Sequence, residues 1–192
     1  MTKFLLVLHV LVAIIAIGPV TVAASMFPPG ARRALADPGD PRATETVRLL
    51  HRICRVYAAI GIAVPVLGFA TALSMGVLDD AWLVASMVLT GIAAAVLLAL
   101  VLPRQEEILE AVESAGTVEA VESAGTVEAV EAAGSPSLPT SPPPSASPSV
   151  SVPVGADPRA TVRLAMFTGI FNLLWATVTI LMIVRPGSTT GA

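Results

Sequence analysis

The sequence predicts an all-α fold: a four-transmembrane-helix bundle with a long disordered cytoplasmic loop between the third and fourth helices. Hydrophobic residues make up 55% of the 192 residues and charged residues only 13%, whereas an average soluble domain is about 25% charged. Between the third and fourth helices, a Glu-rich repeat and a Pro/Ser-rich segment lack the apolar residues of a packed core. Four apolar runs can each cross a hydrocarbon core of about 30 Å, and they cover residues 4–25, 53–75, 81–102 and 164–184.

The first run contains one ionisable side chain, His9. It also resembles a signal peptide, because Lys3 precedes an apolar stretch that ends in small residues. Arg32 and Arg33 follow the run closely, and positive charge there opposes export. We therefore expect an uncleaved helix. The next stretch, residues 28–40, contains PPG and ADPGDP, which predict a loop.

Small residues recur at heptad spacing along one face of the second run. In lipid no hydrophobic force pushes helices together, so close backbone approach along such a face holds a bundle. Pro65 has no N–H for the carbonyl of Gly61 and should kink the helix there. We expect the other helices to pack around this face, above all at Gly61, Pro65, Gly68 and Ala72. The complete face comprises Cys54, Ala58, Gly61, Pro65, Gly68 and Ala72.

A short turn separates the second run from the third. Gly76 suits the left-handed position that ends a helix, and Asp79 or Asp80 can cap the next one. Trp82 then lies where aromatic residues anchor helices at a membrane interface. The fourth run is closed by Arg185 and a proline.

The charges outside the runs predict the orientation. Only Lys3 and Arg185 lie on the side of the chain termini, whereas the two long connections and their flanks carry many arginines. Because cytoplasmic loops carry the excess of positive charge, we expect both long loops in the cytoplasm and both termini outside. Ten Arg against one Lys, with abundant Ala, Val, Gly and Pro, indicate a bacterial genome and hence a bacterial plasma membrane. The arginines of the two connections are Arg32, Arg33, Arg42, Arg48, Arg52, Arg55, Arg104, Arg159 and Arg163.

Residues 105–156 differ from the rest of the chain. They contain no Lys or Arg, and the nonapeptide AVESAGTVE occurs at 111–119 and again at 120–128. A step of nine residues turns a helix by about 900°, so successive copies face opposite ways and form no continuous apolar stripe. We expect the third helix to end within a few turns of Arg104 and a disordered spacer to follow; a docking segment for a partner is the alternative. The predicted organisation is helices one to three in 1–104, this loop in 105–156, and the fourth helix with a short tail in 157–192.

His9 is the default functional candidate, because it is the one ionisable residue within a span. Hydroxyl and thioether groups lie at a similar depth on the other helices. One interpretation is a neutral imidazole that is hydrogen-bonded to Ser or Thr across helices. The alternative is an axial ligand of haem or a soft metal, with Met87 or a second subunit's His9 as its partner. The groups at this depth are Thr71, Ser74, Ser86, Met87, Thr177 and Thr179.

Two further polar residues bear on function. Asn172 lies in the middle of the fourth run, where we expect an interhelical hydrogen bond or, alternatively, a substrate contact. His51 lies at the opposite side of the membrane from His9, so the two cannot share a metal, and we expect His51 to contact lipid phosphate. The spans lack Asp, Glu and Lys, and the chain shows no phosphate loop, Cys/His metal cluster, nucleophile elbow or DNA-reading motif. We therefore expect neither catalytic residues nor nucleic acid as a partner.

Three stretches resemble a single family. FLLVLHVLVAIIAIGPVTVA, RLLHRICRVYAAIGIAVPVLGFATAL and RLAMFTGIFNLLWATVTILMIV are similar to bacterial predicted integral membrane proteins catalogued as domain of unknown function 2269. The resemblance covers the four spans and omits the Glu-rich and Pro/Ser-rich insert. The family has no established activity, so the resemblance implies topology. Its marks are His9, Gly18, Pro19, Arg52, Arg55, Tyr57, Gly61, Pro65 and Gly68.

More distantly, a histidine early in the first helix resembles the copper-resistance D-type proteins and the haem-containing protoporphyrinogen oxidase of bacteria. In the latter family the histidine works with a lysine in the third helix, but Ala81–Leu102 contains no Lys. Any haem or copper that this resemblance implies therefore depends on His9 alone.

These observations lead to three hypotheses. The first is a non-enzymatic structural or interaction component of the membrane, which acts in the lipid bilayer as a homodimer or with another membrane protein. The second is a haem- or copper-binding redox or metal-handling protein that uses His9. The third is a small-solute carrier that works as a dimer, with Asn172 and the kink at Pro65 in its path.

Overall fold

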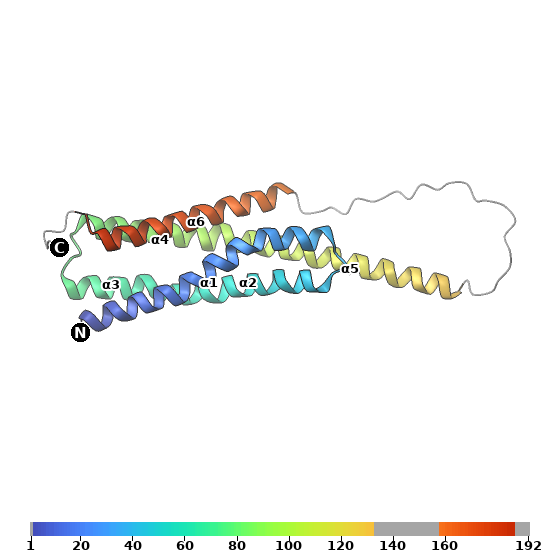
Figure 1. Cartoon of the computed structure of the whole chain (residues 1–192), viewed down its shortest axis with the longest axis horizontal. Helices are drawn as coiled ribbons and strands as arrows, with labels where there is room; N and C mark the ends of the chain where they lie inside the picture. The colour runs from blue at the N-terminus through green and yellow to red at the C-terminus, as the bar shows by residue number, and fades with distance from the viewer. Residues whose placement is uncertain (1, 133–157, 187–192) are drawn as a thin grey trace.

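The computed structural model describes residues 2–132 and 158–186, in which every regular element is a helix (Figure 1). Within these residues, four stretches are long and apolar enough to cross a membrane: Thr2–Ala36, Pro41–Met75, Ala81–Thr126 and Arg159–Val184. This confirms the predicted all-helical class. The elements are α1 (Thr2–Ala36), α2 (Pro41–Gly61), α3 (Ala63–Met75), α4 (Ala81–Val96), a π-helical turn η1 (Leu97–Val101), α5 (Leu102–Ala132) and α6 (Pro158–Val184).

The bundle has two ends (Figure 1). The turn at residues 37–40 defines the α1–α2 end, and the turn at residues 76–80 defines the α3–α4 end. The first residues of α1 and the last residues of α6 also lie at the α3–α4 end. Gly76 closes α3 with a φ of 68°, the left-handed conformation that the sequence predicts.

The second span is broken where Pro65 predicts a kink. α2 ends at Gly61 and α3 begins at Ala63, with the Ile62 N–H donating to the Ala59 carbonyl at 3.3 Å. The missing N–H of Pro65 would have bonded the carbonyl of Gly61, so the break lies where the helical hydrogen-bond ladder loses a donor. The kink also turns the packed face of α3. Pro65 is exposed, and the neighbouring Val64 is buried in its place.

The predicted loop at residues 28–40 is instead mostly helix. α1 continues through Pro28 and Pro29 to Ala36, which leaves only residues 37–40 as a turn. Each proline removes one hydrogen bond from the helix, but burial compensates for the loss. Phe27 and Ala31 are fully buried and belong to the main hydrophobic core, which extends over the facing side of α2.

The main core occupies the α1–α2 half of the bundle. It joins side chains from all four helical stretches, and its largest fully buried members come from α1 and α6. The helices extend past their apolar runs at this end, so part of the core lies beyond the predicted spans. Members of the core that decide the packing are Phe27, Val47, Val101, Val112, Leu164 and Phe171.

The Glu-rich repeat is helical as far as Ala132, whereas we expected the third helix to end soon after Arg104. Its first copy packs against the α1–α2 end. Val112 is fully buried, Glu113 pairs with Arg48 of α2 at 2.8 Å, and a Cβ added to Gly116 would lie 3.2 Å from the Pro38 carbonyl.

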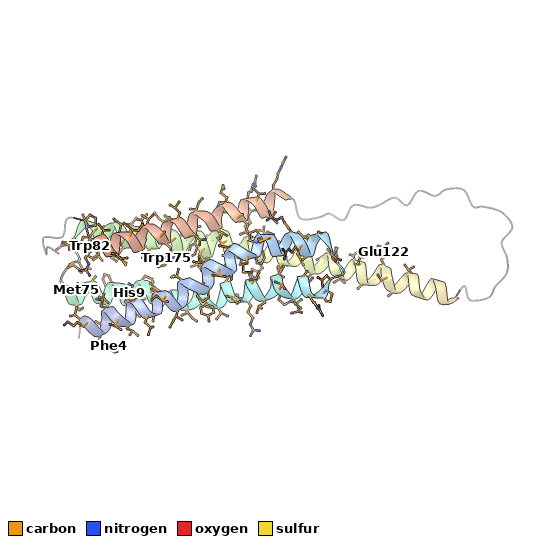
Figure 2. The ribbon with its side chains drawn as sticks, viewed as in Figure 1. Phe4, His9, Met75, Trp82, Glu122 and Trp175 are labelled. Atoms are coloured by element: carbon orange, nitrogen blue, oxygen red, sulfur yellow. The ribbon has the colours of Figure 1, made fainter. Side chains whose placement is uncertain are left out.

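The second copy of the repeat lies beyond the bundle, where Figure 2 shows Glu122 on the protruding part of α5. Val121 is 67% exposed, and a Cβ added to Gly125 would meet nothing within 4 Å. The expectation of a disordered spacer is therefore wrong for the first copy, which is helical and packed, while the second copy makes no contact at its glycine. The predicted disorder of residues 133–156 lies outside the described residues.

Candidate functional site

Two pairs of helices enclose a cavity toward the α3–α4 end. α1 packs on α3 and α4 packs on α6, whereas α3 and α4 make few contacts with each other. The cavity between the pairs has a volume of about 990 Å³. It is lined by residues of all four helical stretches, most of them apolar. Its polar lining comes from His9, Thr21, Tyr57, Thr71, Thr90, Asn172, Thr179 and Arg185.

His9 lies in the wall formed by α1 and α3 (Figure 2). It is 8% exposed, and its Nδ1 lies 3.1 Å from the Val64 carbonyl. A carbonyl only accepts hydrogen bonds, so Nδ1 carries the hydrogen and Nε2 keeps a lone pair. Gly68 makes room for the ring, because a Cβ there would lie 3.0 Å from His9 Cε1. The imidazole therefore occupies the space beside α3 that a side chain at position 68 would need.

The hydroxyl groups near His9 are not its partners, although the sequence suggested that they would be. Each donates to a carbonyl one turn earlier in its own helix: Thr71 to Leu67 at 2.7 Å and Thr179 to Trp175 at 2.9 Å. Ser86 does the same toward Trp82 at 2.8 Å. Side chains that bond their own helix in this way have used their only hydrogen. They add acceptor oxygens to this region but no free donors.

Asn172 makes an interhelical hydrogen bond at the inner part of the cavity. Its Nδ2 donates to Ser25 Oγ of α1 at 3.2 Å, and the Ser25 hydroxyl in turn donates to the Thr21 carbonyl at 2.7 Å. The Asn172 Oδ1 is buried and has no hydrogen-bond partner among the described residues. The amide therefore both ties α6 to α1 and keeps one acceptor unused.

Trp82 and Arg185 lie at the α3–α4 end of the cavity. The Trp82 Nε1 donates to Asp80 Oδ2 at 3.1 Å. Asp80 is the N-cap residue of α4, but its side chain makes no capping hydrogen bond and instead orients the indole. The Arg185 guanidinium carbon lies 5.4 Å from the centroid of the Trp82 ring, which is a cation–π contact. Arg185 has a φ of 45°, which is unusual for a residue other than glycine.

Of the other residues singled out in the sequence, His51 and Cys54 do not line this cavity. His51 is 9% exposed at the α1–α2 half and belongs to the buried face of α2, so the expected contact with lipid phosphate is wrong. The only cysteine, Cys54, is buried and accepts a hydrogen bond from Gln105 Nε2 at 3.5 Å. Met87 lines the same cavity as His9. The described residues contain no group of three His, Cys, Asp or Glu side chains that could hold a metal ion.

No protein-family model, curated protein or solved structure matches the chain. The resemblance to the membrane family named above therefore stays a prediction, and the function has to be argued from the geometry of this chain. That geometry is compatible with the class of multi-pass membrane proteins, because four of its helices are long and apolar enough to span a bilayer.

Proposed function

We propose that this protein is a non-enzymatic component of a bacterial plasma membrane that binds an apolar ligand within the bilayer. In this proposal the α3–α4 end and both termini face outward, and the α1–α2 end and α5 lie in the cytoplasm. The excess of arginine in the connections supports that orientation. The observation that carries the proposal is the cavity of about 990 Å³ between the two pairs of helices.

The cavity has the chemistry of a ligand site. Small-molecule pockets measure roughly 300–1,000 Å³, are mainly apolar, and contain a few polar groups that orient the ligand. Here most lining side chains are aliphatic or aromatic, and His9 and Asn172 are among the few polar residues that line the cavity. The few contacts between α3 and α4 leave a route from the surrounding lipid into the cavity.

A site of this kind favours an apolar ligand over a hydrophilic solute. The hydroxyl groups near His9 donate to their own helices, and the described residues that line the cavity include no carboxylate or lysine. A hydrophilic molecule would lose its hydration without gaining enough hydrogen bonds. The hypothesis of a small-solute carrier with Asn172 and Pro65 in its path is therefore limited to apolar solutes.

The experiment compares two glycines that both have open space beside them. Gly91 of α4 lines the cavity and Gly169 of α6 does not, and a Cβ at either position would meet nothing within 4 Å. Proteoliposomes that contain a long-chain hydrocarbon with a photoreactive diazirine are irradiated, and the labelled residues are mapped by mass spectrometry. We expect labelling inside the cavity, loss of that labelling in Gly91→Phe, and normal labelling in Gly169→Phe. Equal labelling of cavity residues in both variants would contradict the proposal.

One observation favours haem or copper as a second candidate. In metal-binding histidines the second ring nitrogen commonly donates to a backbone carbonyl, and His9 Nδ1 has this arrangement with Val64. Nε2 would then be the ligating atom, and Met87 is in the same cavity. The purified protein should in that case show a Soret band or stoichiometric copper that disappears in His9→Ala. A colourless and metal-free protein would eliminate this candidate.

A further inference from the structure

We infer that the cavity holds the acyl chain of a phosphate-headed lipid and that Arg185, stacked on Trp82, binds its phosphate. This inference rests on the proposed function and specifies the ligand. It starts from the position of Arg185, which directly follows α6 and lines the cavity at the α3–α4 end. The residue is partly exposed, which leaves room for a ligand beside its side chain.

The contact with Trp82 holds the Arg185 guanidinium in place and leaves its N–H donors able to bind a phosphate. The Arg185 guanidinium carbon lies over the Trp82 ring, 5.4 Å from its centroid, and this cation–π contact holds the side chain. The N–H donors of a guanidinium point outward in its own plane, where they can bind two phosphate oxygens at once. Arg185 forms no ion pair in the part of the chain that the structure describes, because the ion pairs there involve Arg48 and Arg104.

The indole itself is fixed by a second contact. Asp80 Oδ2 accepts from Trp82 Nε1 at 3.1 Å, so the ring on which Arg185 rests has a defined orientation. The carboxylates of Asp79 and Asp80 lie in the same turn. Because Asp80 contacts the same indole as Arg185, its carboxylate suits the ammonium group of a zwitterionic head. Anionic and zwitterionic phospholipids both present a phosphate that Arg185 can bind. The rest of the headgroup determines which of the two classes binds better.

The length of the cavity suits an acyl chain. Along α6 the lining runs from Arg185 to Phe171, and at 1.5 Å per residue this is about 21 Å. One leaflet of the hydrocarbon core is about 15 Å deep. A chain that enters beside Arg185 can therefore extend along the apolar wall over the full depth of its leaflet.

The experiment uses three photoreactive lipids with the same diazirine-bearing acyl chain: phosphatidylglycerol, phosphatidylethanolamine and diacylglycerol. Each is incorporated into proteoliposomes of the full chain, and cross-links to cavity residues are quantified by mass spectrometry. We expect both phospholipids to label the cavity about tenfold more than diacylglycerol, the ratio for one charge-assisted contact to phosphate. Arg185→Gln should reduce phospholipid labelling to the diacylglycerol level, and Arg185→Lys should restore part of it.

Arg55→Gln serves as the control, because Arg55 is an exposed arginine of α2 that does not line the cavity. It should leave all three labelling levels unchanged. A preference for phosphatidylglycerol would support the inference and identify an anionic head, and equal labelling by the two phospholipids would support recognition of the phosphate alone. Equal labelling by all three lipids, unaffected by Arg185→Gln, would overturn the inference. In that case loss of labelling in Gly91→Phe would still support the apolar site, so the two proposals fail separately.

Discussion

Substituting Gly68 by alanine tests the contact between α1 and α3 at atomic scale. The added Cβ would lie 3.0 Å from His9 Cε1 and 3.4 Å from His9 Nδ1, which is closer than a methyl group and a ring normally approach. The imidazole has to move, and its hydrogen bond to the Val64 carbonyl is then lost. Overpacking costs about 1–3 kcal/mol, and an interhelical hydrogen bond in a membrane protein contributes about 0.6 kcal/mol. Alanine returns about 1 kcal/mol of helix propensity, so we expect a net destabilisation of about 0.6–2.6 kcal/mol.

The assay is the free energy of unfolding in mixed micelles, followed by circular dichroism, with His9 and Gly61 as reference sites. Gly61→Ala should be neutral or stabilising, because its Cβ would meet nothing within 4 Å. In a His9→Ala background the methyl group at position 68 has room, so Gly68→Ala should stabilise by about 1 kcal/mol. The double-mutant cycle should therefore be strongly non-additive. Equal effects of the two glycine substitutions, or additivity with His9→Ala, would refute the packing described for this site.

Three further predictions concern the rest of the molecule. Gly116→Val should loosen α5 from the turn at residues 37–40 and increase proteolysis there, since its Cβ would lie 3.2 Å from the Pro38 carbonyl; Gly125→Val, at the same place in the second repeat, should change nothing. Asn172→Leu should cost no more than about 0.6 kcal/mol of unfolding free energy, because it removes one bond to Ser25 and also a buried oxygen without a partner. A cysteine introduced at position 42 should react with a membrane-impermeant maleimide only after intact cells are permeabilised; reaction in intact cells would reverse the proposed orientation.

The features that follow from local chemistry were predictable from the sequence. Four apolar runs predicted four long helices, Pro65 predicted the break after Gly61, and Gly76 predicted the left-handed end of α3. Each depends on residues that are neighbours in the chain. The loop predicted at Pro28 failed because local turn propensity was outweighed by the burial of α1 against α2.

The candidate site depends on contacts between distant segments, which no spacing in the sequence indicates. His9, Asn172 and several hydroxyl groups at the depth of His9 were recognised in advance, because polar groups are rare in the spans, but their contacts were not. The acceptor of His9 is a backbone carbonyl, and every residue of every helix has one. Arg185 was recognised only as the end of the fourth run, although an arginine and a tryptophan at the same membrane depth were a usable signal.

The two copies of AVESAGTVE allow the packing of α5 to be tested by deletion. Removing residues 111–119 or residues 120–128 yields the same chain, because the copies are identical. We expect that chain to be as stable as the full protein, since one copy remains beside the α1–α2 turn and the lost copy made no close contact at its glycine. Deleting residues 105–128 instead removes Ile108 and Val112, which are 3% and 0% exposed. Burial of these two side chains contributes about 3–6 kcal/mol, so the larger deletion should reduce the unfolding free energy by that order.

Unchanged stability of the chain with one copy, together with lower stability of the 105–128 deletion, would explain how a packed helix tolerates a tandem duplication. A nine-residue insertion turns the following residues by about 900° and would reverse the face of any helix that is packed along its whole length. In α5 the reversal falls where Val118 and Val121 are 64% and 67% exposed, so no buried contact follows it. Equal stability of the full chain and of the 105–128 deletion would show that α5 does not contribute to the core. The ion pair between Arg48 and Glu113 would then be an incidental surface contact.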